Sequence, residues 1–480
     1  MRVRMGVALH APAACHCDGE AILSPPPLYP KCNRKSVFAT NFEPSPAASR
    51  RPLAIIAATL LTLAGLAMAT ATLAKDGDIA GQWSGTWAAS PQAASVPLEF
   101  SGQTIRQIVH ASIGGTQVRV RLSNAYGASP LHIGAARVGL RSTGALIAAG
   151  SNRVLTFSGS ASTTIPVGAL AVSDPVDLRV PDRADLAISL WIPGNQPAAT
   201  EHKLGLQTTY VSPEGDFSGA DLLPTATTTA SYYYLAGVDV RSSVPSRAIV
   251  VLGDSITDGL HSSPDANRRW PNRLAERLGT GKGGNRVAVL NAGISGNRIL
   301  HDKAGTNASA RLDRDVLVQP GARYLIVLEG INDIGIPGGS AAEEIIAGHH
   351  QIIDRAHAMG LKVYGGTLTP FQAFLPGIYY SAENEATRQV VNQWIRASKA
   401  YDAVIDFDRA LRDPANPSAM RPAYDSGDHL HPNDAGYQAM ADAVDLSLFD
   451  VGTRGRQAAA AKGPTLANGK PNATPCKCPQ

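Results

Sequence analysis

The most constraining feature of this 480-residue sequence is an apolar run, AIVVL at 248–252, that passes through Gly253 directly into Asp254 and Ser255. The run shows no alternation of polar and apolar positions, which is typical of a strand buried on both faces in a helix-covered parallel sheet. Because Gly, Asp and Ser are common turn residues, the pattern fits a simple turn at the strand end. It also fits a rigid strand that presents Ser255 as a nucleophile, and the rest of the chain decides between these interpretations.

Further runs of the same kind follow, and helical stretches separate them. The clearest helix is expected at 340–359, with Ser340 as its N-cap, and a last helix at 433–449. Alternating strands and helices predict an α/β domain over residues 247–452, with a doubly wound, flavodoxin-like sheet of five parallel strands. The further runs are VAVLNAG (287–293), YLIVLEG (324–330), LKVYGG (361–366) and AVIDF (403–407).

Residues 81–245 carry a different pattern, in which apolar and polar residues alternate. The clearest examples are QVRVRLSN at 117–124 and DLAISLWIP at 185–193. A period of two predicts strands that are half buried, and turn residues recur between them. Since no convincing helical pattern appears, we expect an all-β sandwich or jelly roll ahead of the α/β domain.

The two ends of the chain differ from both of these parts. Residues 50–74 have an Arg pair, an apolar run and a small-residue exit, which predicts a secretory signal peptide. We therefore expect a secreted or periplasmic protein with no stable membrane insertion after signal cleavage. Residues 1–49 are expected to be a disordered extension, or to begin ahead of a true start nearer Val37. Residues 453–480 contain no acid and are expected to be a disordered tail.

The charges and cysteines concentrate in these ends. The net charge is +4, but residues 1–74 and 453–480 together hold twelve basic residues and three acidic ones, so the stretch between them has a net charge of −5. This balance gives no reason to expect a nucleic-acid partner. No cysteine lies between residues 33 and 475, which excludes a thiol nucleophile there. An isolated Cys-x-Cys at 476–478 is weak evidence for a metal, and we expect no cofactor.

Polar side chains follow the expected strands at the points where those strands end. Because the carboxyl ends of parallel strands share one edge of a sheet, these side chains should lie together. They supply a hydroxyl, an imidazole, a carboxylate and several amide donors. The stretches are GDS at 253–255, NAGISGNR at 291–298, EGINDIG at 329–335 and DSGDHLHPND at 425–434.

Acyl transfer requires this set of groups. A serine hydroxyl needs a histidine to take its proton, and a carboxylate must orient that histidine. Asp428 and His431 are three residues apart, so their side chains can point the same way in a tight turn. His429 is the competing base, and the spacing alone leaves it open.

The four motifs, in this order, resemble the four sequence blocks of the SGNH (GDSL) hydrolase family. The phrases GTWAASP, LSNAYG and LEGINDIG resemble its xylan-esterase-like branch, which has a β domain ahead of the hydrolase. The resemblance implies a metal-free reaction with Ser255 as nucleophile, His431 as base and Asp428 orienting His431. It also implies an oxyanion hole formed by the backbone N–H groups of Ser255 and Gly296 and by the Asn332 amide.

Other residues of these blocks are expected to lie next to the reacting groups and to hold them in position. They are Asp254, Asn297, Asp333 and His429. One departure from the family pattern is Glu329, because a small residue usually stands ahead of GxND. A carboxylate facing the oxyanion hole would be unhelpful, so we expect Glu329 to face away and to pair with a base.

The expected activity is hydrolysis of acetylated carbohydrate or short acyl esters through a covalent acyl-enzyme, with a small-molecule or glycan ester as the partner. Two alternatives stay open. The first is a lipase for long acyl chains, with the apolar stretch FQAFLPGIYY at 371–380 as a wall. The second is a carbohydrate-binding protein whose hydrolase domain has lost activity. The sequence predicts no particular oligomeric state.

Overall fold

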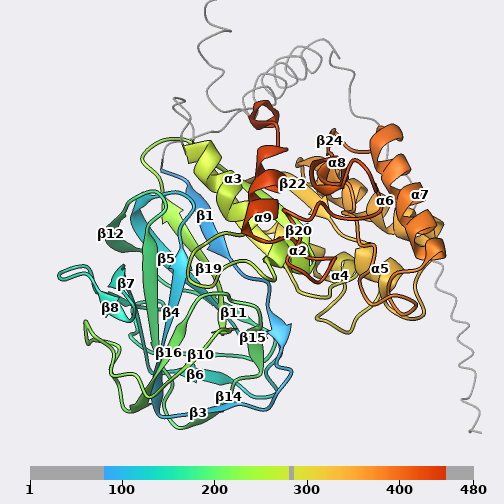
Figure 1. Ribbon diagram of the computed structural model, residues 1–480. Coiled ribbons are helices and arrows are strands. Elements are labelled where there is room, and N and C mark those ends of the chain that lie inside the picture. The colour runs from blue at the N-terminus through green and yellow to red at the C-terminus, as the bar shows by residue number, and fades with distance from the viewer. Residues whose placement is uncertain (1–80, 280–285, 450–480) are drawn as a thin grey trace, which may run out of the picture. The chain divides into compact units, whose positions relative to one another are not determined.

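The computed structural model describes residues 81–279 and 286–449, which belong to one compact unit (Figure 1). The expected extension at 1–49, the signal peptide at 50–74 and the tail at 453–480 lie outside the described residues. Within the described ranges, the helices are too short or too polar to cross a lipid bilayer.

The first part of the described chain, blue to green in Figure 1, is β-rich. Its strands are β1 Trp83–Ala88, β2 Gln92–Ala93, β3 Glu99–Ser101, β4 Gln103–His110, β5 Gly115–Ser123, β6 Leu131–Ile133, β7 Ala135–Thr143, β8 Leu146–Ile147, β9 Arg153–Leu155, β10 Thr163–Ile165, β11 Leu170–Val172, β12 Val176–Val180, β13 Asp185–Trp191, β14 Asn195–Pro197, β15 Thr200–His202, β16 Thr209–Glu214, β17 Thr227–Thr229, β18 Tyr232–Tyr233 and β19 Leu235–Arg241.

Two larger antiparallel sheets organise this β part. One has the order β1-β19-β5-β11, with β12 also paired to β5. The other has the order β17-β16-β4-β13-β7-β8, with β9 paired to β7. Smaller sheets pair β6 with β10, β3 with β14, and β15 with both β2 and β18. The jelly-roll form of this part stays a prediction.

Strand β13 shows how the alternating pattern becomes packing. Leu186, Ile188 and Leu190 are fully buried in the main hydrophobic core. The expectation that the opposite face meets solvent is wrong, because Ser189 on that face is fully buried as well. The Ser189 hydroxyl accepts a hydrogen bond from Nε of the buried Arg106 at 2.8 Å. A charged side chain from the neighbouring strand β4 therefore covers the face that alternation predicts to be exposed.

The second part, yellow-green to red in Figure 1, contains a parallel sheet with the order β21-β20-β22-β23-β24. The five apolar runs seen in the sequence form its five strands, and β20 lies between β21 and β22. All residues of β20 from Ala248 to Gly253 are buried, as the unbroken apolar run predicts. The strands are β20 Ser246–Gly253, β21 Arg286–Gly293, β22 Ala322–Leu328, β23 Lys362–Gly366 and β24 Ala403–Ile405.

Helices connect and cover these strands. In Figure 1, α3 lies beside α9, and α6 packs beside α7. The helices are α2 Ser255–Asp258, α3 Trp270–Gly279, α4 Ala308–Leu312, α5 Ile331–Gly335, α6 Ala342–Ala358, α7 Ala382–Ala397, α8 Phe407–Leu411 and α9 Asp434–Asp442, with a π-helical turn at Asp313–Leu317 and a 3-10 turn at Leu446–Leu448.

Two helix ends differ from the sequence expectation. Helix α6 takes Ala341 as its N-cap, because the Ser340 hydroxyl lies 3.2 Å from His301 Nε2 instead of capping the helix. Helix α9 ends at Asp442, so the expected helix at 433–449 is shorter than predicted. Its N-cap Asn433 accepts hydrogen bonds from two backbone N–H groups, which sets where the preceding loop ends.

The β part and the parallel sheet share one continuous hydrophobic core. Strand β1 packs against β20 and β21, and Gly85 N donates a hydrogen bond to Pro320 O at 2.8 Å. The β part therefore supports the parallel sheet directly, at the strand that carries Ser255 at its end.

Candidate active site

Ser255 lies at the junction between strand β20 and helix α2. The strand ends at Gly253, where a Cβ would collide with Thr257 Oγ1 and lie 2.9 Å from Leu328 O. Asp254 then caps the helix by accepting a hydrogen bond from Ile256 N at 2.9 Å. The sharp turn places Ser255 in the first helical position, beyond the carboxyl end of the interior strand β20.

The side chains of Ser255, His431 and Asp428 form a connected row. Ser255 Oγ lies 2.8 Å from His431 Nε2, and His431 Nδ1 lies 2.6 Å from Asp428 Oδ2. A carboxylate can only accept, so Nδ1 carries the proton and Nε2 is left to accept the serine proton. Ser255 and His431 are each 5% exposed. The row can therefore move a proton from the serine hydroxyl to the imidazole.

Asp428 is held as a carboxylate by its own turn. Its Oδ1 accepts hydrogen bonds from His431 N at 2.8 Å and from Leu430 N at 3.0 Å. Partial burial alone would raise the pKa of Asp428, but these bonds and the His431 ring hold that pKa far below its usual value. Asp428 thus stays charged and keeps the His431 ring in a fixed orientation.

The structure places His429, the competing base, away from the serine. Its Nδ1 lies 2.6 Å from Asp425 Oδ2, and its side chain is half exposed. Its backbone φ of +71° lies in the left-handed region and turns the side chain away from that of His431. His429 instead braces the loop through Asp425.

Sequence reasoning missed a second histidine on the same carboxylate, His261. Its Nε2 lies 3.2 Å from Asp428 Oδ2, and its ring centroid lies 5.5 Å from that of His431. Ligand atoms of His261, Asp428 and His431 all lie within 4.8 Å of one another, so these three residues could hold a metal ion. The left-handed backbone at His261, with φ of +69°, brings the ring there, and no sequence motif signals it.

Two backbone N–H groups near Ser255 have no hydrogen-bond partner among the described residues. They belong to Ser255 itself and to Gly296, which lies in the loop after β21. Gly296 has φ of +80°, which favours glycine, and a Cβ there would lie 2.9 Å from the side chain of Ala304. Both groups are available as donors.

Asn332 at the start of helix α5 is fixed in one orientation. Its Nδ2 donates to Asn297 O at 3.0 Å, and the Tyr379 hydroxyl lies 2.9 Å from its Oδ1. With Oδ1 engaged as an acceptor, the amide cannot turn over without losing both contacts. The second N–H of Nδ2 is then left to donate to another group.

Three of the residues expected to support the site, Asp254, Asn297 and Asp333, bond to backbone near it. Asp333 accepts from Ile299 N at 2.8 Å and from Leu300 N at 3.0 Å, which ties the loop after β21 to helix α5. Asn297 Nδ2 donates to two carbonyl oxygens of the same loop, at 2.9 Å each. Burial raises the pKa of the capping residue Asp254 to about 7.

Comparison with known families identifies this region. Residues 251–439 match the GDSL-like Lipase/Acylhydrolase family. These residues form a GDSL-like domain. The resemblance of residues 251–439 to the SGNH (GDSL) hydrolases is thereby confirmed, and this domain is that of a carboxylic ester hydrolase, whereas the xylan-esterase-like branch stays a prediction. A search of curated proteins finds no match.

Several solved structures are similar to part of this chain, and each covers less than half of it. A carbohydrate acetylesterase from Sinorhizobium meliloti is 17% identical, with a TM-score of 0.33, and covers 41% of this chain and 95% of its own. A GDSL-like lipase from Bacteroides thetaiotaomicron is 18% identical, with a TM-score of 0.33, and covers 42% of this chain and 87% of its own. The aryl esterase of M. smegmatis is 16% identical, with a TM-score of 0.35, and covers 43% of this chain and 99% of its own.

Glu329 in the GDSL-like domain is fully buried, and burial raises its pKa well above the usual value despite a contact with Arg311 at 3.5 Å. Burial therefore favours the protonated form of this side chain. Arg311 is itself fully buried and donates to Gly253 O at 3.1 Å and to Asn297 Oδ1 at 2.9 Å. Glu329 thus faces Arg311. Arg311 in turn links the end of β20 to the loop after β21.

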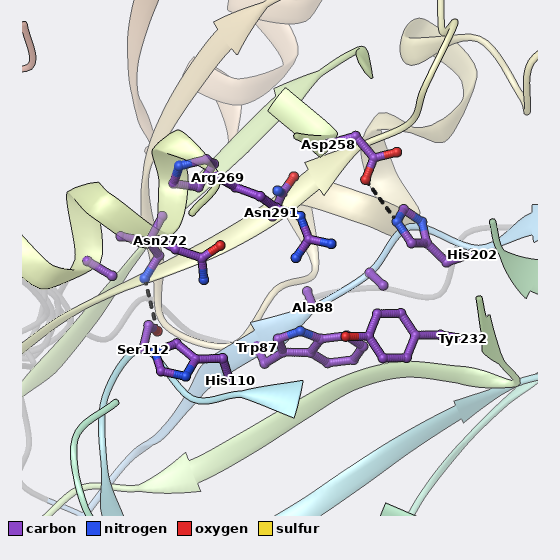
Figure 2. Close-up of a pocket in the computed structure, with 14 residues that line it drawn as sticks. Trp87, Ala88, His110, Ser112, His202, Tyr232, Asp258, Arg269, Asn272 and Asn291 are labelled. Carbon is purple, nitrogen blue, oxygen red and sulfur yellow. Dashed lines mark hydrogen bonds and ion pairs between the residues drawn. The ribbon is translucent and has the colours of Figure 1, made fainter. Parts of the chain in front are cut away.

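The β part reaches the GDSL-like domain through a buried ion pair (Figure 2). His202 Nε2 of β15 lies 3.0 Å from Asp258 Oδ1 of α2, and Asp258 Oδ2 accepts from Ser295 N at 2.9 Å. The two side chains face each other beside a cavity of about 30 Å³ that Trp87 and Tyr232 also line. Burial alone would lower the pKa of His202, but the Asp258 carboxylate raises it above the usual value.

Proposed function

We propose that the chain is a serine esterase that hydrolyses acetylated carbohydrate or short acyl esters through a covalent acyl-enzyme. The observation that carries the proposal is the row of contacts from Ser255 through His431 to Asp428 inside a GDSL-like domain. The hydrolysis of esters follows from the family, whereas the roles of these residues and the substrate are our inference.

In the proposed reaction, Ser255 Oγ attacks the ester carbonyl carbon while His431 Nε2 takes its proton. The carbonyl oxygen becomes an oxyanion, which the Ser255 and Gly296 N–H groups and the free N–H of Asn332 stabilise. The protonated His431 then gives its proton to the leaving alcohol, and an acyl-serine remains. Water, deprotonated by His431, attacks the acyl-serine and releases the acid and the free hydroxyl of Ser255.

Two clefts formed in part by the loops that carry site residues have polar side chains in their linings, which supports a polar substrate. One cleft of about 490 Å³ runs beside Asp425 and His429, and another of about 390 Å³ lies beside Leu260 and Ser295. Charged and amide side chains contribute to both linings. Burying a long alkyl chain against such groups would leave them without partners, so this lining favours a sugar or another polar alcohol over a long acyl chain.

We further propose that the enzyme acts outside the cytoplasm. This proposal rests on the sequence of residues 50–74, which has the layout of a secretory signal. Expression of the full chain in a bacterium, followed by sequencing of the mature N-terminus, tests it. Cleavage after Ala71 or Ala74 is expected, and an uncleaved product retained in the cytoplasm would contradict it.

Hydrolysis of a p-nitrophenyl ester series from acetate to palmitate tests the activity. We expect kcat/KM to be greatest for acetate or butyrate and to fall with longer chains. A palmitate optimum would identify a lipase, and no turnover on any member would indicate a binding protein. Either outcome would overturn the proposal.

A further inference from the structure

A cleft between the β part and the GDSL-like domain suggests a binding site for one half of the substrate. Its volume is about 390 Å³. One wall comes from β2, β15 and the residues that follow them, including Gln92 and Lys203. The other wall comes from hydrolase loops, including Leu260, Ser295 and Lys303. The β part therefore shapes this cleft jointly with the hydrolase.

The hydrolase wall of the cleft is made by the same loops that carry the reacting groups. Leu260 N donates to Ser255 O at 3.0 Å, and Leu260 directly precedes His261, which contacts Asp428. Ser295 directly precedes Gly296, whose N–H is an available donor. A substrate whose ester group lies at Ser255 can thus extend a neighbouring part into this cleft.

The polar groups on the β wall are held in place by hydrogen bonds. Glu201 Oε1 accepts from Ser95 N at 3.0 Å and from Ser95 Oγ at 3.3 Å. Gln92 Oε1 accepts from Lys203 N at 3.1 Å, which fixes the backbone from which the lysine side chain extends. This wall is therefore ordered before any ligand arrives, which reduces the entropy lost on binding.

Two lysines give the cleft its charge. Lys203 and Lys303 are both exposed, and within the described residues neither ammonium group has an ion-pair or hydrogen-bond partner. Together with the Glu201 carboxylate, they give the lining a net charge of +1. A ligand group with a single negative charge complements this lining, whereas a neutral sugar leaves both ammonium groups without a partner.

We propose that this cleft binds the alcohol part of the ester, and that the preferred substrate is an acylated sugar that carries a carboxylate. The carboxylate pairs with Lys203 and Lys303, while sugar hydroxyls bond to Glu201 and Gln92. This inference rests on the proposed esterase function, and it adds a substrate class and a role for the β part.

Three acetate esters separate the inference from the proposed function. They are p-nitrophenyl acetate, which has no sugar, an acetylated methyl xyloside, which is neutral, and an acetylated methyl galacturonide, which carries a carboxylate. Each is assayed with the wild type, with the double variant Lys203→Ala/Lys303→Ala, and with Lys362→Ala as control. Lys362 is also an exposed lysine, but it begins β23 at the opposite end of the parallel sheet.

The expected result is a lower KM for the galacturonide than for the xyloside in the wild type. The double variant should raise the galacturonide KM about threefold to tenfold, as for two exposed ion pairs, and leave kcat unchanged. Kinetics on p-nitrophenyl acetate should not change, which also shows that the variant is folded. The control should match the wild type on all three esters, and added salt should raise only the galacturonide KM.

An equal KM for the two sugars, or a double variant that behaves as wild type on the galacturonide, would overturn the inference. So would turnover of p-nitrophenyl acetate without turnover of either sugar ester. Failure of the proposed function is a different result, namely no turnover of p-nitrophenyl acetate by the wild type.

Discussion

Removal of one buried hydroxyl, in Tyr379→Phe, tests how Asn332, the proposed oxyanion donor, is held. The Tyr379 hydroxyl lies 2.9 Å from Asn332 Oδ1 and 3.1 Å from Ile331 O, so its proton serves one of these acceptors. The ring itself packs edge-on against Phe374, with centroids 4.9 Å apart, and should stay in place as phenylalanine. The change therefore removes the contact that orients the amide while conserving the packing.

The expected loss is partial, because Asn332 Nδ2 keeps its 3.0 Å bond to Asn297 O. A single buried hydrogen bond contributes about 0.5–1.5 kcal/mol net, which corresponds to a fall in kcat of about 2-fold to 12-fold. Removal of the donor itself, in Asn332→Ala, should lower kcat by about 10²–10³. KM should change little in either variant, because the bond to the oxyanion forms in the transition state.

Steady-state kinetics on p-nitrophenyl acetate measure this effect, with Tyr380→Phe as control. Tyr380 packs against Phe371 at 5.2 Å, but its hydroxyl has no hydrogen bond in the described part of the chain. The double variant Asn332→Ala/Tyr379→Phe should be no slower than Asn332→Ala alone. If Tyr379→Phe slows the Asn332→Ala enzyme by the same factor as the wild type, Tyr379 does not act through Asn332 and our reasoning is wrong.

Three further predictions concern the buried charges and metals. His202→Ala leaves the Asp258 carboxylate buried without its partner and should lower the free energy of unfolding by about 3–5 kcal/mol in urea titrations. The native pair should stabilise most below about pH 6.5 and lose this effect as pH rises through the raised pKa of His202; a pH-independent loss would contradict this. Burial raises the pKa of Glu329, so wild-type stability should fall as pH rises above about 4.5, and Glu329→Gln should flatten that fall in urea titrations from pH 5 to 8. Exhaustive dialysis against EDTA should leave activity unchanged, whereas loss restored by zinc would make the His261 cluster a functional metal site.

The contacts among Ser255, His431 and Asp428 could be predicted from the sequence, because the positions of these residues follow from local pattern. The apolar run before Ser255 specifies a buried strand, and the topology of parallel sheets places the residue at its carboxyl end on the edge where ligands bind. The three-residue spacing of Asp428 and His431 is satisfied within one turn, whose backbone N–H groups also bond to Asp428. Local geometry of this kind needs no knowledge of distant contacts.

The supporting groups depend on contacts between residues far apart in the chain, so sequence pattern does not reveal them. Arg311 donates to Ser90 Oγ at 3.0 Å across 221 residues, and His202 reaches Asp258 across 56. His261 lies on the shared carboxylate because of a left-handed backbone that no motif predicts. Contacts of this kind form only when the β part and the hydrolase fold together, so the sequence pattern does not indicate them.

The most direct test of the central claim is labelling with a fluorophosphonate, which reacts with an activated serine. Trypsin should release residues 248–268 as one peptide, and this peptide contains Ser255, Ser262 and Ser263. We predict one label per chain, located by fragmentation on Ser255, and its loss in Ser255→Ala and in His431→Ala. A label on Ser262, Ser263 or any other residue, or undiminished labelling of Ser255→Ala, would contradict the account.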